Sequence, residues 1–242
     1  MRARARVLVV GVGGLGCPAA IALARAGVGT LGLADDDEVD VTNLHRQILF
    51  TDADVGAHKV DAAMRALAGM APALVVEPHR TRLLPSNAVD LVGRYDVVVE
   101  GSDNFATKFL AADACAIAKV PVVHAAAVRW HGTVLAVGRA GGPGYRCLFE
   151  DLPGGDAAPN CAEAGVVGPM VGVVGALQAD LALALLDGED VAGTLVTFDG
   201  KTDAFRRRRL APRATCALCG PASIGKIETI DEARYAPASC DG

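Results

Sequence analysis

The chain has 242 residues and a formal net charge of −5 at pH 7, and 52% of its residues are hydrophobic while 21% are charged. This composition excludes a disordered chain, and the acidic balance argues against a general nucleic-acid-binding protein. Aromatic residues make up only 4%, so the core must consist mainly of Val, Leu and Ala, as in a parallel sheet covered by helices. The seven cysteines are scattered along the chain and do not resemble the disulfide framework of a small secreted protein.

Two stretches imitate membrane signals. Residues 1–17 start basic and continue apolar, but the apolar run is short and interrupted by glycines, so we expect no cleaved signal peptide. Residues 164–186 are long and apolar enough to span a bilayer, but they contain Pro169, Gln178 and Asp180, so we interpret them as a buried core helix. We therefore expect a cytoplasmic protein with no membrane partner.

Residues 7–37 have the pattern of a nucleotide-binding βαβ unit. An apolar run, Val7–Val10, is followed by close-spaced glycines, an Ala-rich helical pattern and a second apolar run that ends in acids at Asp35. The glycines allow a tight turn and let a phosphate approach main-chain N–H groups at the helix start. Those expected to do so are Gly11, Gly13 and Gly14. Asp35 stands at about the distance at which an acid hydrogen-bonds a ribose, but the motif alone does not say which nucleotide binds.

The rest of the chain alternates between helical and strand patterns. We predict a helix within residues 51–68 that has Lys59 near its start, and helices over residues 85–92, 106–119 and 164–186. We predict strands over residues 74–77, 95–100, 121–127, 132–138 and 226–230, and an antiparallel hairpin over 194–210 with Asp199-Gly200 as its turn.

These elements predict an α/β fold. We expect a Rossmann-like, doubly wound, mostly parallel sheet with helices on both faces, extended by C-terminal antiparallel strands. Because no linker is long enough to separate two domains, we expect a single domain over residues 1–242. Its nucleotide-binding part would be residues 1–138, and residues 139–242 would supply a loop, the core helix, antiparallel strands and a CxxC tail.

Polar residues directly follow the buried strand predicted at 95–100. Ligands of open α/β sheets bind at the carboxyl ends of strands, which places Ser102, Asp103 and Asn104 at the site. Asp103 has an alternative role as the cap of the helix that follows.

Six motifs, taken in order, resemble the ThiF/MoeB/HesA family, the bacterial relatives of ubiquitin-activating enzymes. They are GVGGLG, DDDEVDVTNLHRQ, GAHKV, GSDN, NCAEAGVVGPMVGVVGALQA and the terminal CALCG, and the resemblance covers roughly residues 6–235. It implies that the protein is an adenylyltransferase that binds ATP rather than NAD. Its substrate would be the C-terminal glycine carboxylate of a small ubiquitin-like sulfur carrier, and pyrophosphate would be released. Attaching AMP gives the carboxylate a good leaving group, and cations must screen the two negative reactants.

The resemblance also implies roles for matching residues. Gly11, Gly13 and Gly14 would cradle the nucleotide, and Asp35 would hold the ribose. Residues that would hold the triphosphate are Asn43, Arg46 and Lys59, with Gln47 shaping their loop. Asp103 would bind Mg²⁺, with Asn104 beside it. Taken alone, Arg46 has the alternative of a surface arginine, and Lys59 that of a solvated helix residue.

The cysteines divide into three groups. Cys161 precedes a helix, whose N-terminus favours thiolate; the family carries a cysteine here that some members use in an acyl intermediate, so Cys161 is either a nucleophile or a loop residue. The resemblance implies a zinc site at Cys147, Cys216 and Cys219, but the set is incomplete because Gly144 stands where the fourth cysteine belongs. A site that has lost its metal is the alternative. Cys17 and Cys115 lie in apolar helices and are expected to be buried.

The implied partners are a small ubiquitin-like carrier protein ending in Gly-Gly and a sulfurtransferase or cysteine desulfurase. A homodimer is implied as well, because family members use an N-terminal arginine that reaches the ATP of the other subunit. The spacing of Arg2, Arg4 and Arg6 does not match that arginine. We expect Arg206–Arg209 to form a basic strand edge, or a docking surface for an acidic carrier, rather than a nucleic-acid site.

Three alternative functions stay open. An NAD-dependent oxidoreductase fits the glycine motif, but it leaves Arg46, Lys59 and Asp103 without a shared purpose. Adenylation of a peptide carboxylate in natural-product biosynthesis uses the same residues on another substrate. A degenerate scaffold would bind the carrier without activating it.

Overall fold

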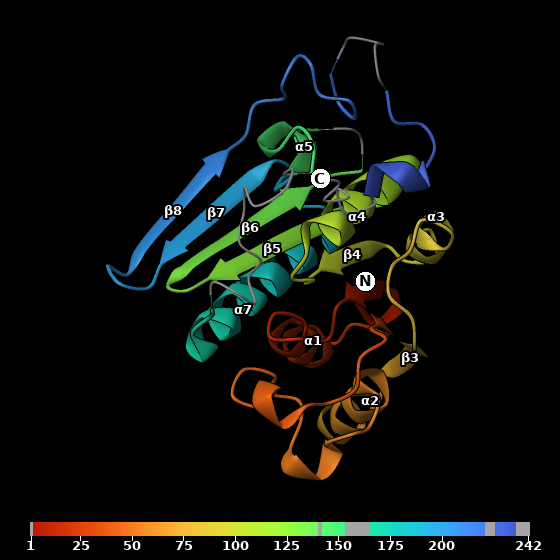
Figure 1. Cartoon of the computed structure of the whole chain (residues 1–242), viewed down its shortest axis with the longest axis vertical. Coiled ribbons are helices and arrows are strands. Elements are labelled where there is room, and N and C mark those ends of the chain that lie inside the picture. Colours follow the sequence, from red (N-terminus) through yellow and green to blue (C-terminus); the bar gives the residue numbers. More distant parts are fainter. Residues whose placement is uncertain (1, 140–141, 153–164, 221–225, 236–242) are drawn as a thin grey trace, which may run out of the picture.

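In the computed structural model, which describes residues 2–139, 142–152, 165–220 and 226–235, eight strands form a single sheet in the order β3-β2-β1-β4-β5-β6-β7-β8 (Figure 1). The strands are β1 (Arg6–Val10), β2 (Thr30–Ala34), β3 (Val75–His79), β4 (Val97–Glu100), β5 (Val122–Val128), β6 (His131–Val137), β7 (Thr194–Asp199) and β8 (Ala204–Arg209). Strands β3, β2, β1, β4 and β5 pair in parallel, and β5 to β8 pair antiparallel. The predicted fold class is confirmed.

Helices cover both faces of the sheet (Figure 1). The first face carries α1 (Gly16–Arg25), α2 (Lys59–Met70) and α7 (Gly168–Leu186), and the second carries α3 (Ala88–Val92), α4 (Phe105–Ala118) and α5 (Tyr145–Leu148). Short 3₁₀ turns are η1 (Arg2–Arg4), η2 (Val41–Asn43), η3 (Asp52–Asp54) and η5 (Glu232–Tyr235). Successive side chains of a strand point to opposite faces. Accordingly, Val7 and Val9 enter the first core while Leu8 and Val10 enter the second.

Helix α7 is the one described helix that is long and apolar enough to cross a membrane. In this structure it packs instead against α1 and the strands β4, β5 and β6. Its inner side is buried at Val174, Gln178 and Leu181, as expected for a core helix, while Val173 and Ala176 on the other side are exposed.

The helix predicted within residues 51–68 is present as α2, which begins at Lys59, the residue expected near its start. Thr51 and Asp54 form a reciprocal capping box around η3. The chain then passes Gly56 at φ +82°, in the left-handed region that a continuing right-handed helix excludes. The strand predicted over 226–230 was wrong, since these residues are irregular.

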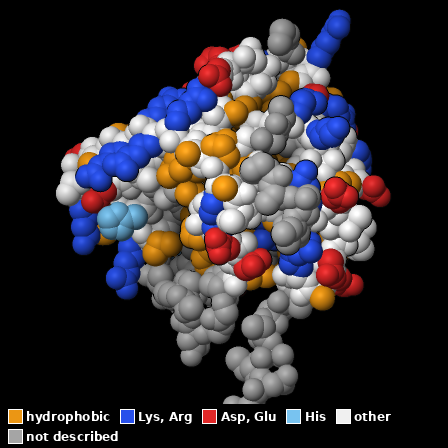
Figure 2. Space-filling view, turned by 90° about the horizontal axis from the view of Figure 1, so that it is seen from above, with side chains coloured by type: hydrophobic (Ala, Val, Ile, Leu, Met, Phe, Trp, Pro, Cys, Tyr) orange, Lys and Arg blue, Asp and Glu red, His pale blue; other side chains and the backbone are white. Residues whose placement is uncertain are grey.

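The predicted hairpin is present, but its turn is longer than Asp199-Gly200. Asp199 is still paired with Ala204, so residues 200–203 form the loop. The resulting β8 is an outer strand of the sheet, and Arg206–Arg209 along it belong to a basic flank of the molecule (Figure 2). At the other edge, β3 contains Pro78.

Candidate functional site

A cavity of about 430 Å³ lies at the carboxyl ends of β1, β2 and β4. The chain leaves β1 for α1 on one face of the sheet and leaves β4 for α4 on the other, so the two connections diverge and leave a crevice between them. The volume is in the range of small-molecule sites. Predicted site residues that line it are Gly11, Gly13, Gly14, Asp35, Arg46, Gln47, Lys59, Asp103 and Asn104.

The glycine turn forms the floor of this cavity. Gly11 has φ +83°, and a Cβ there would lie 3.2 Å from the backbone of Gly101, so the turns after β1 and β4 touch. At Gly13 a Cβ would meet only the Gln47 amide, at 3.8 Å. The backbone at Gly13 is therefore open to a ligand, as a phosphate cradle requires.

Asp35 holds the glycine turn and the acidic loop together. Its carboxylate accepts hydrogen bonds from the backbone N–H of Val12 at 2.7 Å and of Asp37 at 2.9 Å. Burial raises the pKa of Asp35, while Lys59 and the two N–H groups oppose that rise. The residue thus has a structural role in addition to the ribose contact that we predicted, and its oxygens retain lone pairs for such a contact.

Lys59 is the first residue of α2 and is almost fully buried. Its Nζ lies 2.7 Å from Asp37 and 4.0 Å from Asp35. The interpretation of Lys59 as a solvated helix residue is therefore wrong, and its contact with Asp37 helps to fix the loop. A buried ammonium at the cavity wall, balanced by two carboxylates, is suited to hold an anionic ligand.

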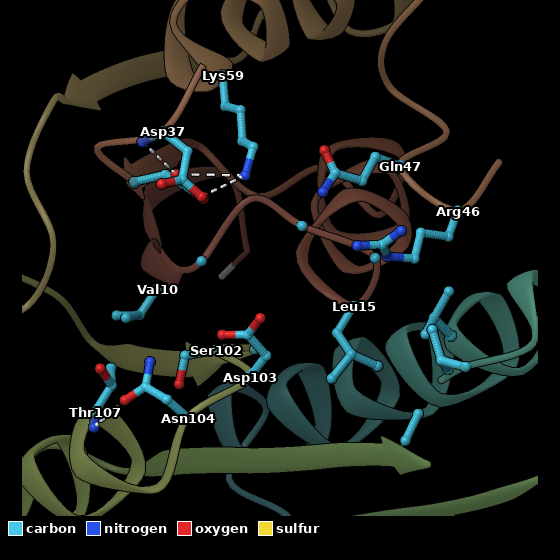
Figure 3. Close-up of a pocket in the computed structure, with 18 of the residues that line it drawn as sticks. Val10, Leu15, Asp37, Arg46, Gln47, Lys59, Ser102, Asp103, Asn104 and Thr107 are labelled. Atoms are coloured by element: carbon cyan, nitrogen blue, oxygen red, sulfur yellow. Dashed lines mark hydrogen bonds and ion pairs between the residues drawn. The ribbon is translucent and has the colours of Figure 1, made fainter. Parts of the chain in front are cut away.

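Arg46 and Gln47 enter the cavity from the loop after η2, opposite Asp103 (Figure 3). No acidic side chain among the described residues is ion-paired with Arg46. Gln47 is buried, and its Oε1 has no hydrogen-bond partner in the described structure. An unpaired cation and an unsatisfied amide oxygen at one wall indicate that a polar ligand belongs there.

Asn43 is not among the residues that line the cavity, and its contact with the triphosphate stays a prediction. It ends η2, and its carbonyl accepts hydrogen bonds from the backbone N–H of Arg46 and Gln47, both at 3.0 Å. In this structure Asn43 shapes the loop that presents those two side chains.

From the sequence, Asp103 has two alternative roles, ligand binding and capping of the following helix, and the structure separates them between Asp103 and Asn104. The exposed carboxylate of Asp103 points into the cavity (Figure 3). Asn104, rather than Asp103, caps α4, because its Oδ1 accepts a hydrogen bond from the backbone N–H of Thr107 at 2.8 Å. Asp103 is therefore left free to bind a ligand or a hard cation.

The sequence did not indicate the buried polar network beneath Asp103. Glu100 ends β4 with no exposed surface and accepts hydrogen bonds from Ser102 N at 2.8 Å, from Ser102 Oγ, and from Lys108 Nζ at 2.8 Å. His124 Nδ1 lies 3.2 Å from the same carboxylate. Burial alone would raise the pKa of Glu100, but Lys108 and His124 lower it to about 2. The charged Glu100 clamps the turn that carries Asp103.

Two more residues of the site were not assigned from sequence. Gln178 of α7 donates to the carbonyls of Glu100 and Val123, both at 2.7 Å, and so ties α7 to the sheet under the cavity. A lone amide within an apolar helix was the available signal. Arg82 lines the cavity and pairs with Asp36 at 2.9 Å, and no sequence pattern pointed to it.

The N-terminal arginines lie away from the cavity. Arg6 starts β1, at the opposite end of that strand from the glycine turn, and pairs with Glu77 at 2.8 Å. Arg2 pairs with Asp187 after α7. Neither serves the nucleotide site of its own chain.

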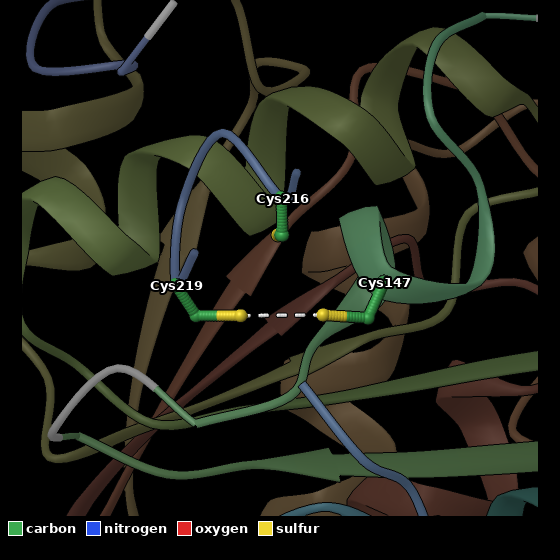
Figure 4. Close-up of side chains that lie close together, drawn as sticks. All are labelled: Cys147, Cys216 and Cys219. Atoms are coloured by element: carbon green, nitrogen blue, oxygen red, sulfur yellow. Dashed lines mark hydrogen bonds between the residues drawn. The ribbon is translucent and has the colours of Figure 1, made fainter. Parts of the chain in front are cut away.

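The structure brings Cys147, Cys216 and Cys219 together, with sulfur atoms within 4.8 Å of one another (Figure 4). It does not supply a fourth cysteine, histidine or carboxylate to this cluster among the described residues. Cys161 lies outside the described residues. Cys17 and Cys115 are buried as expected, and burial raises the pKa of both thiols.

Comparison with known proteins identifies the family. Residues 2–219 match the model of the ThiF family. The chain belongs to this family. It is 46% identical over 222 residues to "Adenylyltransferase and sulfurtransferase MOCS3" of Anopheles gambiae, with 90% of the chain and 50% of that protein covered. It is 40% identical over 241 residues to "Adenylyltransferase and sulfurtransferase uba4" of Aspergillus fumigatus, with 93% and 49% covered.

This ThiF-family chain thus spans about half the length of the curated relatives it matches. Among solved structures, E. coli MccB with MccA-N7isoASN superimposes with a TM-score of 0.79 at 21% identity, covering 90% of this chain and 68% of MccB. PaaA superimposes with a TM-score of 0.72 at 22% identity, covering 86% of this chain and 64% of PaaA. At these identities the likeness establishes the fold alone.

Proposed function

We propose that the chain is an ATP-dependent adenylyltransferase that activates the C-terminal glycine carboxylate of a small ubiquitin-like sulfur carrier. The observation that carries this proposal is the position of Arg46 and Asp103 on opposite sides of the cavity above the glycine turn. Both residues line the cavity, and neither forms an ion pair within the described residues. The relatives' shared name, adenylyltransferase and sulfurtransferase, supports the reaction class.

The proposed reaction joins the carrier carboxylate to the α-phosphorus of ATP and breaks the bond to pyrophosphate. Both reactants are anionic, so the barrier falls where fixed cations neutralise the charge that gathers on the phosphoryl oxygens. Arg46 and Lys59 supply that charge from two sides of the cavity, and the N–H groups of the turn at Gly13 face the phosphates. Mg²⁺, when bound, would screen phosphate oxygens, and Asp103 is the residue that would hold it.

We infer two protein partners and one metal ion in addition. A sulfurtransferase or cysteine desulfurase would act on the activated carrier, since the relatives' names pair an adenylyltransferase activity with a sulfurtransferase activity. A second copy of the chain would cover the apolar outer side of α7, where Val173 is 38% exposed, which analytical ultracentrifugation tests. A zinc ion would be held by the three clustered thiols.

The test is exchange of labelled pyrophosphate into ATP in the presence of a carrier ending in Gly-Gly. We expect exchange that depends on the carrier, and a loss of about 100-fold or more in Arg46→Ala, as for removal of other groups that stabilise transition-state charge. Arg25→Ala is the matched control, because Arg25 is an exposed arginine in the last turn of α1. Absence of exchange with every such carrier, in a protein that binds ATP, would contradict the proposal and favour a scaffold or a peptide substrate.

A further inference from the structure

An apolar wall lies on one side of the cavity, away from the loop that carries Arg46. Val10 ends β1, Ala34 ends β2 and Leu83 follows β3, and all three are buried and line the cavity. Val10 and Arg46 lie on opposite sides of the cavity (Figure 3). The cavity therefore has a cationic side at Arg46 and, across from it, the apolar wall of Val10, Ala34 and Leu83.

This arrangement sets the direction in which a nucleotide lies. Phosphates belong at the N–H groups of the glycine turn and near Arg46, and a ribose belongs at Asp35. The base is attached to the ribose on the side away from the phosphates, and it is flat and has two apolar faces. It therefore belongs beyond Asp35, at the apolar wall.

Arg82 stands directly beside this wall. It precedes Leu83 and lines the cavity, and its Nε donates to both carboxylate oxygens of Asp36, at 3.1 and 2.9 Å. Its side chain is 63% exposed, so Asp36 rather than burial directs it toward the cavity. Because N–H bonds lie in the plane of a guanidinium, the contact with Asp36 occupies one edge of the group and leaves its faces available to a ligand.

The backbone that carries Arg82 is fixed by the start of α3. The carbonyl of Arg82 accepts hydrogen bonds from Thr81 Oγ1 at 3.0 Å and from Asn87 Nδ2 at 3.1 Å. Asn87, the residue before α3, also accepts a hydrogen bond at Oδ1 from the backbone N–H of Leu84 at 2.9 Å. The turn between β3 and α3 is thus closed by Asn87, and it presents Arg82 to the cavity from a defined position.

A second arginine after β3 provides a comparison. Arg80 has a side chain that is 59% exposed, and it pairs with Asp61 at 2.6 Å. It is not among the residues that line the cavity. Arg80 and Arg82 therefore match in charge, in exposure and in pairing with an aspartate, and they differ in whether the guanidinium borders the cavity.

We propose that Arg82 binds the base of the nucleotide, with its guanidinium covering one face of the ring while the apolar wall contacts the opposite side. A guanidinium over an aromatic face is attracted by the electrons of the ring, most strongly where water is excluded. Asp36 holds the group in place before the ligand arrives. The inference rests on the proposed function only in that the ligand is a nucleoside triphosphate, and it does not depend on the adenylation step.

The test compares ATP, 2′-deoxy-ATP and inorganic tripolyphosphate, each with Mg²⁺, in calorimetric titrations of the full chain. Tripolyphosphate has the phosphates without the ribose or the base. We expect Arg82→Ala to bind ATP and 2′-deoxy-ATP about 10-fold more weakly, the size of a cation–π contact shielded from water, with little change for tripolyphosphate. Arg82→Lys keeps the charge but not the plane, so it should recover little of the affinity. Arg80→Ala, the matched control, should bind all three ligands as the wild type does.

Three results would overturn the proposal. An equal loss for ATP and tripolyphosphate in Arg82→Ala would place Arg82 at the phosphates, and a loss for ATP with none for 2′-deoxy-ATP would place it at the ribose. Wild-type affinities for all three ligands would leave the pair of Arg82 and Asp36 as a surface contact. If the wild type binds ATP but supports no pyrophosphate exchange, adenylation is contradicted, and the same titrations still decide the base contact. Thermal unfolding confirms that each variant is folded.

Discussion

Helix α4 carries one partner of each of two buried ion pairs, and the two pairs differ in what they hold. Lys108 pairs with Glu100 under the turn that bears Asp103, and Asp113 pairs with Arg146 beside Cys147. Glu100 collects donors from four groups of its own neighbourhood, whereas Asp113 accepts from Arg146 and from Tyr235. One pair braces the candidate active site, and the other attaches a distant segment to the core.

The comparison shows that similar burial does not imply a similar purpose. Removing either partner should cost stability, because a buried charge without its counter-ion is strongly unfavourable. Only the pair under Asp103 should also change ligand binding. Both pairs lie on one helix, so α4 links the turn at the cavity to the thiol cluster.

Arg146→Met should have the largest effect on stability. It leaves the fully buried Asp113 with the hydroxyl of Tyr235 as its remaining described donor, and we expect a loss of about 5 kcal/mol, the upper end for a broken buried pair. Urea denaturation measures the loss, and Arg146→Lys, which keeps the charge but not the two-pronged contact, should lose less. ATP affinity of the folded fraction should be unchanged. If fully folded Arg146→Met binds ATP more weakly than the wild type, the pair of Arg146 and Asp113 also supports the cavity and the distinction between the two pairs is wrong.

Lys108→Met should lose about 3 kcal/mol, the lower end for such pairs, because Glu100 keeps the donors of Ser102 and His124. Unlike Arg146→Met, it should also weaken binding of Mg-ATP, because the turn that presents Asp103 loses its brace. Calorimetric titration of the folded protein checks this point, and Lys108→Arg should restore it. Equal nucleotide affinity in the two Met variants would remove the functional distinction between the pairs.

The pair of Lys108 and Glu100 should also make stability depend on pH in acid. The pKa of Glu100 is lowered to about 2 in the folded chain from an ordinary value of 4.5, so it binds its proton more readily when unfolded. The stability that this provides is complete above about pH 4.5 and is lost as the pH falls toward 2. In Lys108→Met, burial should dominate and raise the pKa of Glu100 above its ordinary value, so that its contribution is present below about pH 4.5 and is lost as the pH rises. Urea denaturation at several pH values measures the free energy of unfolding of both proteins. The same dependence on pH in acid for wild type and Lys108→Met would contradict the role of Lys108.

Tyr235→Phe should have a smaller effect, confined to the Arg146 end. Loss of its hydrogen bond to the carboxylate of Asp113, 2.6 Å long, should cost about 1.5–3 kcal/mol. Burial and Asp113 raise the pKa of Tyr235 above its ordinary value of 10, so its contribution is complete below pH 10 and is lost as the pH rises beyond it. The difference in the free energy of unfolding between wild type and Tyr235→Phe should therefore become smaller above pH 10. A difference that does not vary with pH would assign the effect to packing alone.

Asn104→Ala should have the smallest effect, about 1 kcal/mol from loss of the α4 cap. Asn104→Ser keeps a capping oxygen and should restore both the stability and the placement of Asp103. If ATP affinity falls in Asn104→Ser while stability is kept, Asn104 contacts the ligand in addition to capping the helix. Thermal unfolding and nucleotide titration measure the two quantities.

The features that sequence predicted well are those that local rules determine. Glycine spacing, apolar runs and strand ends placed Gly11, Asp35 and Asp103 at one edge of the sheet, and the structure brings them to one cavity. The same rules placed Lys59 near the start of a helix, and α2 begins at that residue.

The features that sequence missed depend on contacts between distant elements. In the sequence, Glu100 is only the end of a strand and Gln178 only a polar residue in an apolar helix. The two are 78 positions apart, and a hydrogen bond joins them under the site. Asn43 belongs to a family motif, but the motif does not show that its carbonyl accepts hydrogen bonds from Arg46 and Gln47, because this depends on the path of one loop. Such partnerships follow from how the layers pack, which spacing along the chain does not encode.

The two outer strands of the sheet have a consequence for how the protein meets other chains. In β3, residues 75 and 79 direct their backbone bonds toward the inner strands, so the nitrogen of Pro78, which has no hydrogen to donate, faces outward. In β8, four consecutive arginines place like charges along the free edge. Neither outer strand is a good template for another β-strand. Copies of the chain should therefore resist edge-to-edge aggregation, and partners should recognise its side chains rather than extend its sheet.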